Sequence, residues 1–185
     1  LAVNSFEGLM RYNAKGELEP ACAESYEVSE DGLTYTFTMR DGLKWSNGAE
    51  LSAKDFEYAW KRMANPDTAA DYSYLCAMFA GYDETKGLAD DDVVASEDGK
   101  TLTVKLAAVT PYFLDLCAFP TFFPVYQDTV ENNADWANDA GENFVTNGAF
   151  TLKSWNHDSS MVYVKNPNYW DAANVTVDTM NVMLT

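Results

Sequence analysis

Residues 33–63, "LTYTFTMRDGLKWSNGAELSAKDFEYAWKRM", carry the clearest structural signals in the chain. Apolar and polar residues alternate in the first part, which is typical of a half-buried strand. One face of this strand carries Tyr35, Phe37 and Met39, and threonines lie between them. Asn47-Gly48 then predicts a tight turn, because these residues supply the positive φ angles that such turns need. The stretch has no nucleophile–base pair, metal-ligand spacing or phosphate loop, so it predicts structure rather than chemistry.

A capped helix completes the stretch. Ser52 is the expected N-cap, and Asp55, three residues later, forms a capping-box-like pair with it. Asn65-Pro66 is expected to end the helix. One apolar stripe at i, i+3, i+4 and i+7 is formed by Phe56, Ala59, Trp60 and Met63. Such a stripe is more often part of a core than a binding face.

The rest of the chain alternates between short elements and polar loops. A strand is predicted at 101–106, and a short helix at 110–119 opens with Pro111 in its first turn. After the polar stretch 126–147 the composition becomes strand-like, and we place a domain crossing near residue 125. The three strands predicted beyond it lie at 148–155, 161–165 and 175–185.

Composition narrows the classes of function. The 185 residues carry a formal net charge of −17, and the 12 Lys and Arg residues are scattered. Binding to nucleic acid or to an anionic membrane surface needs clustered basic residues, so neither partner is expected. No run approaches the ~20 apolar residues of a membrane span. Aromatic residues make up 14% of the chain, which fits either a large core or a ligand-facing cleft.

No residue pattern marks a catalytic or metal centre. Asp90, Asp91 and Asp92 lack the spacing and the terminal Glu of an EF-hand, so we expect a solvated acidic loop rather than a calcium site. His157 stands alone in a turn and is expected at the surface. GxSxG, HExxH and nucleotide-binding motifs are absent. The three cysteines, expected to be buried apolar groups, are Cys22, Cys76 and Cys117. We predict no enzyme activity, metal or cofactor.

Two aromatic segments are candidates for ligand contact. Tyr72 and Tyr74 flank a loop–helix junction in residues 70–82, where packing and ligand contact are equally plausible roles. Phe119 and Thr121 lie beside the predicted domain crossing, and clefts between domains are common binding sites. The residues alone leave these alternatives open.

The order of several motifs resembles a known family. Residues 6–63 begin with "FEGL" and continue through "PACAESYEVSEDGLTYTF" and "KWSNG" to the capped helix. "VTNGAFTLKSW" (145–155) and "VKNPNYWD" (164–171) follow in the second half. "TPYFLDLCAFPTFFPV" (110–125) lies between residues 6–63 and these two motifs. Together they resemble the extracellular solute-binding proteins of ABC transporters, in the dipeptide/oligopeptide-binding family, family 5.

The resemblance implies an α/β fold (mixed α+β) that is periplasmic-binding-protein-like, type II and two-lobed. It also implies a longer parent chain, of which only the small second domain and part of the first are present. In that scheme 1–5 end a first-domain segment, 6–125 form the small second domain, and 126–185 return into the first domain. The large third domain of the family would be missing.

The implied function is capture of short peptides outside the membrane and their delivery to permease subunits. The family's ligand contacts map onto Tyr72 and Phe119, with Tyr74 and Thr121 beside them. The resemblance also implies a monomer without catalysis, exported to the periplasm or to the outer face of the cytoplasmic membrane, with a lipid anchor as one option. The fragment alone is expected to bind peptide poorly.

Three alternatives stay open at this point. A receptor of the same fold could bind nickel complexes, haem, an oligosaccharide or a peptide pheromone. A carbohydrate-active module, enzyme or lectin, would need an exposed platform of Trp45, Trp155 or Trp170 beside paired carboxylates. A purely structural interaction domain would be favoured if no cleft forms near residue 125.

Overall fold

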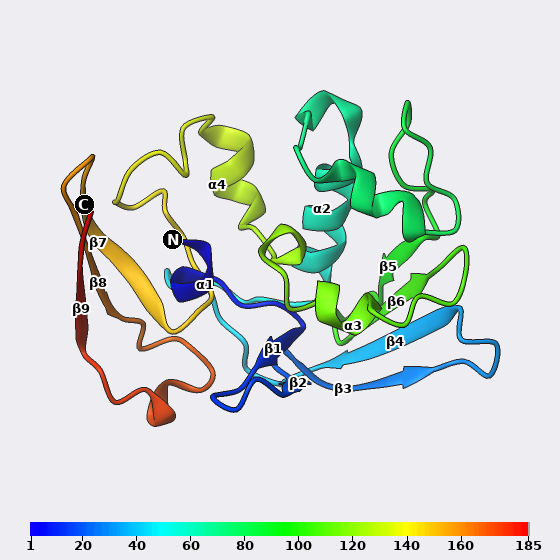
Figure 1. Cartoon of the computed structure of the whole chain (residues 1–185), viewed down its shortest axis with the longest axis horizontal. Coiled ribbons are helices and arrows are strands. Elements are labelled where there is room, and N and C mark those ends of the chain that lie inside the picture. The colour runs from blue at the N-terminus through cyan, green and yellow to red at the C-terminus, as the bar shows by residue number, and fades with distance from the viewer. Residues whose placement is uncertain (185) are drawn as a thin grey trace. The chain divides into compact units, whose positions relative to one another are not determined.

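The computed structural model describes residues 1–184, which form two compact units of mixed helix and strand (Figure 1). Unit 1 comprises Leu1–Glu7, Gly42–Leu51 and Val125–Thr185, and unit 2 comprises Gly8–Asp41 and Ser52–Pro124. The predicted range 6–125 differs from unit 2 chiefly at 42–51. This segment groups with unit 1 because Trp45 packs on Tyr126, at 5.6 Å between ring centroids, and the Ser46 amide donates to the Thr146 carbonyl at 2.7 Å.

Unit 2 is built on a four-stranded antiparallel sheet. The strand order is β3 (Ala23–Val28), β4 (Thr34–Met39), β6 (Thr101–Lys105) and β5 (Val93–Ala95). The predicted strands at 33–39 and 101–106 are confirmed as β4 and β6, and Phe37 lies opposite Leu102 with both side chains buried. Strand β3 was not predicted, because five of its six residues are exposed and its sequence therefore shows no apolar–polar alternation.

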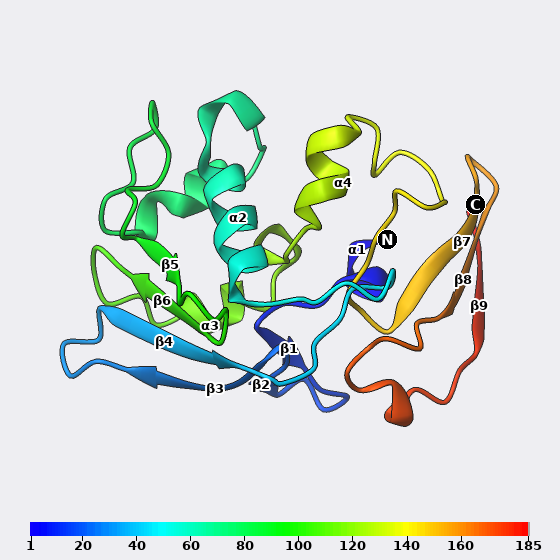
Figure 2. The same ribbon diagram turned by 180° about the vertical axis from the view of Figure 1, so that it is seen from behind.

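Helix α2 (Ala53–Ala64) packs against β5 and β6 on one face of this sheet (Figures 1 and 2). The predicted capping box is present, with the Ser52 amide donating to the Asp55 carboxylate at 2.8 Å. The helix ends at the predicted Asn65. The whole predicted stripe is buried: Phe56, Ala59, Trp60 and Met63.

Short helices and a small hairpin complete unit 2. The 3-10 helices η1 (Pro66–Thr68), η2 (Ser73–Met78) and η3 (Pro120–Phe122) follow α2 in the chain, with α3 (Phe113–Leu116) before η3. Pro111 lies outside α3, contrary to the prediction, because Tyr112 is the N-cap. The hairpin of β1 (Met10–Tyr12) and β2 (Leu18–Pro20) was not predicted. Before it, a Cβ at Gly8 would lie 2.1 Å from the Cys117 carbonyl oxygen, so only glycine fits there.

Unit 1 holds a three-stranded antiparallel sheet. Its order is β7 (Phe150–Asn156), β8 (Ser160–Lys165) and β9 (Thr179–Met183), as the three predicted strands indicate, although Thr185 lies outside the described residues. Helix α1 (Ala2–Ser5) contacts β7. The remaining elements are α4 (Gln127–Asn132) and η4 (Ala172–Asn174). In the predicted turn only Gly48 has a positive φ (86°), whereas Asn47 uses its side chain to accept the Ala49 amide hydrogen at 3.0 Å.

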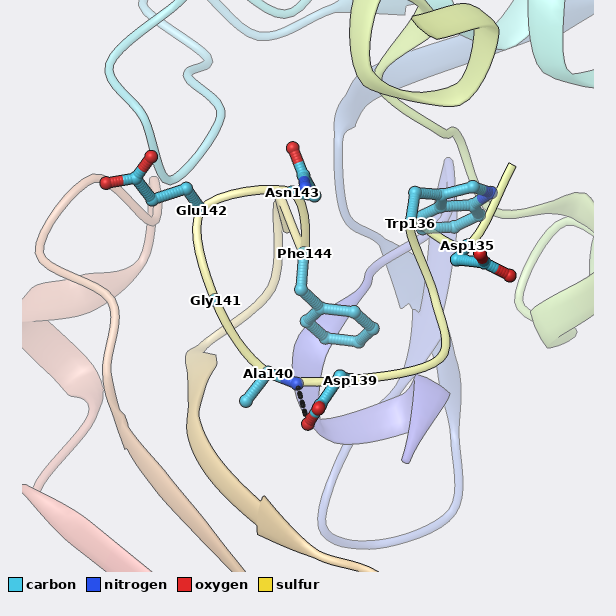
Figure 3. A pocket seen from close by; sticks show the side chains of 8 residues that line it. All are labelled: Asp135, Trp136, Asp139, Ala140, Gly141, Glu142, Asn143 and Phe144. Carbon is cyan, nitrogen blue, oxygen red and sulfur yellow. Dashed lines mark hydrogen bonds between the residues drawn. The ribbon is translucent and has the colours of Figure 1, made fainter. Parts of the chain in front are cut away.

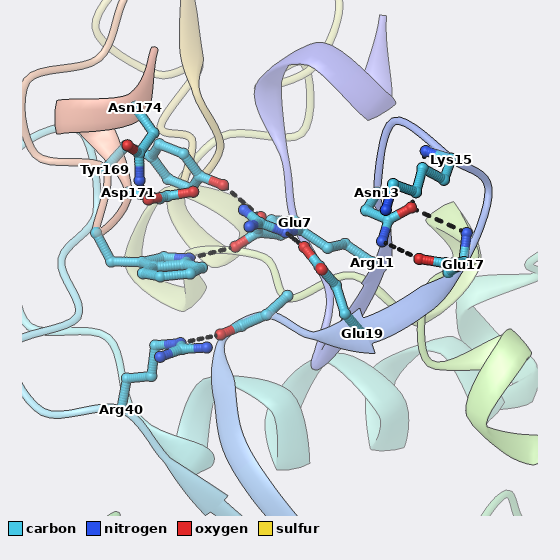
Figure 4. Close-up of polar contacts among 12 residues, drawn as sticks. Glu7, Arg11, Asn13, Lys15, Glu17, Glu19, Arg40, Tyr169, Asp171 and Asn174 are labelled. Carbon is cyan, nitrogen blue, oxygen red and sulfur yellow. Dashed lines mark hydrogen bonds and ion pairs between the residues drawn. The ribbon is translucent and has the colours of Figure 1, made fainter.

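Glu7 joins distant parts of unit 1. The Tyr169 hydroxyl and the Trp170 indole N–H each donate to its carboxylate at 2.5 Å, and Figure 4 shows the tyrosine pointing at it. The Asn147 side chain brackets the Glu7 backbone, accepting its N–H at 3.0 Å and donating to its carbonyl at 2.9 Å. Three motifs that lie far apart in the sequence, "FEGL", "TNGAF" and "NPNYWD", therefore meet at Glu7, the second through its backbone and the third through its buried carboxylate.

Candidate functional site

Three of the four predicted contact residues form an exposed aromatic cluster in unit 2. The exposed fractions of Tyr72, Tyr74 and Phe119 are 48%, 63% and 37%. The Tyr72 ring lies 6.0 Å from that of Tyr74 and 5.8 Å, edge to face, from that of Phe119. Segments separated by more than forty residues thus meet at Tyr72. We call these three residues the ring cluster.

Helix α2 holds the two segments that carry the ring cluster. Trp60 is fully buried, and its indole N–H donates to the Phe122 carbonyl in η3 at 2.9 Å. The same indole packs on the rings of Phe122 and Phe79, which follow the cluster residues in the chain, at centroid distances of 5.4 and 5.9 Å. In η2 the buried Cys76 thiol donates to the Met63 sulfur on α2 at 3.2 Å. The apolar stripe of α2 therefore acts as the support of the candidate site.

Thr121, the fourth predicted residue, lies in η3 and is partly buried. It follows Phe119 by two residues but adds no ring to the cluster. Tyr112, which the sequence analysis did not select, is 58% exposed just before α3 and has no ring contact with the cluster among residues 1–184. The supporting role of Trp60 was also missed, because its position in the stripe indicates burial and says nothing of its indole N–H.

Unit 1 contains a pocket of about 320 Å³ (Figure 3). Its lining combines the rings of Trp136 and Phe144 with three carboxylates, which belong to Asp135, Asp139 and Glu142. Figure 3 shows Asp135 and Glu142 pointing away from one another on opposite sides of the loop. Within residues 1–184, no group of three His, Cys, Asp or Glu side chains is placed to hold a metal ion. The pocket is the interior of a loop, partly filled by the Phe144 ring.

The acidic run at 90–92 differs from the expected solvated loop at one position. Asp92 is 1% exposed, and its carboxylate accepts the backbone N–H groups of Gly81 at 2.8 Å and Ala89 at 2.9 Å. Asp91 is exposed and pairs with Lys105 at 2.7 Å, and this hydrogen bond lowers the Asp91 pKa. Asp92 therefore has a structural role in fixing the loop before β5.

The other residues considered in the sequence analysis do not form a functional site. His157 is exposed, as predicted, and stacks on Trp155 at 4.4 Å between ring centroids. The three cysteines are buried free thiols, as predicted, and burial raises the pKa of Cys76 to about 12. Trp45 is fully buried, and Trp155 and Trp170 are partly buried. These three residues therefore do not form the exposed platform that a carbohydrate-active module would need. In residues 1–184, no helix has the length and apolar character to cross a membrane.

Comparison with known proteins gives a family match over most of the chain. Residues 17–185 match the model of the bacterial extracellular solute-binding proteins, family 5 Middle. Oligopeptide-binding protein OppA of Bacillus subtilis is 42% identical over 183 residues, which are 97% of this chain and 34% of that protein. Dipeptide-binding protein DppE of the same organism is 42% identical over 178 residues, 95% of this chain and 33% of that protein. The chain thus spans about a third of the length of these curated relatives.

Two solved structures have folds that match that of this chain over its whole length. The structure of Listeria monocytogenes OppA bound to peptide matches with a TM-score of 0.92 and 35% identity, over 100% of this chain and 37% of that one. The substrate-binding domain of an oligopeptide ABC transporter from Bacillus anthracis matches with a TM-score of 0.93 and 36% identity, over 100% and 36%. The expected mixed α/β, periplasmic-binding-protein-like fold class is confirmed, and this chain corresponds to a portion of that fold.

Proposed function

The chain belongs to the bacterial extracellular solute-binding proteins, family 5, and from this premise we propose that it works as part of a peptide receptor of an ABC importer. The family and its relatives are binding proteins. The observation that carries the proposal in this chain is the exposed ring cluster, whose segments pack on the buried face of helix α2. Exposed, anchored rings are typical of recognition surfaces, since they offer apolar area at a low cost in side-chain entropy.

We assign Tyr72 and Phe119 to contacts with side chains of the bound peptide, with Tyr74 and Thr121 beside them. Main-chain hydrogen bonds of a strand-like kind would supply affinity that tolerates varied sequences. Capture would be a lobe-closure equilibrium, in which peptide stabilises the closed form through contacts that the open form lacks. The proposal includes the domain scheme of 1–5, 6–125 and 126–185.

The closed receptor would deliver its peptide to permease subunits at the outer face of the cytoplasmic membrane or in the periplasm. We propose that the receptor is a monomer, with no catalytic step and no cofactor. A lipid anchor and a freely exported form are both compatible with this role.

Native mass spectrometry of the full-length protein, purified without denaturation, tests the proposal. We expect co-purified adducts that fragment as short peptides and that are displaced by an added peptide mixture. Isothermal titration with the same mixture should give saturable binding. A single non-peptide adduct, such as a metal chelate, a haem or a sugar, would keep the fold and overturn the substrate. Absence of both adducts and titratable peptide binding would overturn the function.

A further inference from the structure

We propose that the ring cluster selects a basic side chain, Lys or Arg, at one position of the bound peptide. The inference rests on the proposed function and adds the chemical class of side chain that this surface prefers. The attraction would be that between a cation and the negative faces of the aromatic rings.

The geometry leaves ring surface available for such a cation. The Tyr72 ring lies near 6 Å, centroid to centroid, from both neighbouring rings, and each of the three residues is more than a third exposed. A cation within about 6 Å of a ring centroid is attracted, and a side chain beside Tyr72 would lie near two or three rings at once. In residues 1–184, no Lys or Arg of the chain itself contacts these three rings.

The distribution of charge points the same way. The sequence contains no Lys or Arg between Arg62 and Lys86, the segment with Tyr72 and Tyr74. It also contains none between Lys105 and Lys153, the segment with Phe119. Both segments contain carboxylates, so a ligand cation meets no competing positive charge from either one.

Acidic residues strengthen this preference at longer range. Asp67 and Asp71 precede the cluster in the chain, and both are exposed. Unit 2 as a whole has 19 Asp and Glu residues against nine Lys and Arg. The resulting negative potential attracts a basic side chain and repels an acidic one. An aliphatic side chain would gain only apolar contact with the same rings.

A matched set of peptides on the full-length protein tests the inference. The probes are tetra-alanine peptides in which each position in turn carries lysine, norleucine or glutamate. These three side chains are similar in length and differ in charge. Isothermal titration should show one position at which lysine binds about tenfold more tightly than norleucine, with glutamate weakest. The ratio of the lysine to the norleucine affinity is compared within each variant, so a general loss of affinity does not affect it.

Ring substitutions then separate the aromatic contribution from the general negative charge. Tyr74→Leu and Phe119→Leu should reduce the ratio towards one, whereas Tyr74→Phe, which keeps the aromatic face, should preserve it. Tyr112→Leu is the matched control, an exposed tyrosine outside the cluster, and should leave the ratio unchanged.

The outcomes distinguish the two proposals. If no peptide of the series binds, the proposed function fails and this inference fails with it. If peptides bind and the wild-type ratio is near one at every position, only this inference is overturned. A ratio that persists in both leucine variants but falls in Asp71→Asn would assign the preference to carboxylates and would likewise overturn the role of the rings.

Discussion

At the scale of single residues, Trp60 connects the core of unit 2 to the candidate site. Its ring packs edge to face on Phe113 and Phe122, and its N–H donates to the Phe122 carbonyl. A buried indole usually finds such a partner, because an unsatisfied N–H in the interior is costly. The bond spans 62 residues of sequence and fixes η3 beside the helix. One side chain thus contributes to folding and to the placement of Phe119.

Replacing Trp60 with phenylalanine tests this double role. The substitution keeps an aromatic ring but removes the N–H donor and part of the volume, so unfolding should become easier by about 2 kcal/mol. Trp155→Phe in unit 1 is the control, since Trp155 is partly buried and stacks on an exposed histidine, and its effect should be smaller. Urea denaturation of the full-length variants measures both. Equal effects would contradict the assignment of Trp60 as the support.

At the scale of elements, the opening stretch was predicted well because its signals are local. The capping box, the turn glycine and the helix stripe each depend on residues within seven positions. The capping box and the stripe are found in α2, and Gly48 has a positive φ in the turn that precedes it. Strand β5 was missed because it is three residues long and follows a run of three aspartates. Nothing in the sequence distinguishes the buried Asp92 from its exposed neighbours, because its partners are backbone groups brought near by the loop.

The acidic loop offers a matched pair of substitutions at this scale. Asp92→Ala leaves two backbone N–H groups without their carboxylate acceptor in a buried place, and we expect a loss of about 2–3 kcal/mol in unfolding free energy. Asp91→Ala removes an exposed ion pair with Lys105 and should change stability little. Thermal and urea unfolding of both variants make the comparison. If both substitutions lower the unfolding free energy by the same amount, Asp92 does not stabilise the loop.

Two hairpins of unit 2 use the same four residues. "SEDG" stands at 29–32, between β3 and β4, and again at 96–99, between β5 and β6. In both turns the Ser hydroxyl donates to the Asp carboxylate, and the Gly has a φ near 70°. These hydroxyl hydrogen bonds are the main cause of the lowered pKa values of Asp31 and Asp98.

The lowered pKa values predict acid sensitivity of these hairpins. In the unfolded chain the aspartates titrate near 3.8, and in the folded turns they titrate lower. Their stabilising contribution is therefore complete above the unfolded value and is lost as the pH falls through 3.8 towards the folded pKa. The double variant Ser29→Ala, Ser96→Ala should raise both pKa values and flatten the dependence of stability on pH below about 5. Carboxyl chemical shifts recorded against pH measure the pKa values of Asp31 and Asp98. If these pKa values are the same in the variant as in the wild type, the serine hydroxyls are not the main cause of their lowering.

At the scale of the whole molecule, the sequence identified the family but could not give the arrangement of the site. The family signatures are read as separate strings, while their residues act together through contacts more than a hundred positions apart, as at Glu7 and Asn147. Likewise, the resemblance selected Tyr72 and Phe119, and only the folded unit shows that their rings touch. Local periodicity predicts where helices and strands form. It carries no information on which loops they bring into contact.

Glu7 supplies a prediction about this long-range order. In Glu7→Gln the side chain loses its charge and one acceptor oxygen, so either the Tyr169 hydroxyl or the Trp170 indole N–H faces an amide donor. Hydrogen bonds to a charged group are stronger than those between neutral groups. We therefore expect Glu7→Gln to lower the unfolding free energy of unit 1 by about 2–3 kcal/mol. Glu50→Gln, an exposed glutamate of the same unit, is the control.

Hydrogen exchange followed by mass spectrometry shows where that loss is felt. The Glu7 carboxylate binds the segment around Tyr169, and the Glu7 backbone binds the Asn147 side chain. If the carboxylate fixes the position of Glu7, peptides from residues 1–7 and from both segments should exchange faster together in Glu7→Gln, while β4 and α2 of unit 2 keep their rates. Faster exchange confined to the first residues would show that the carboxylate secures only the N-terminal segment. The long-range order of unit 1 would then depend on the apolar contacts of Phe6 with Trp136 and Phe144 rather than on the Glu7 carboxylate.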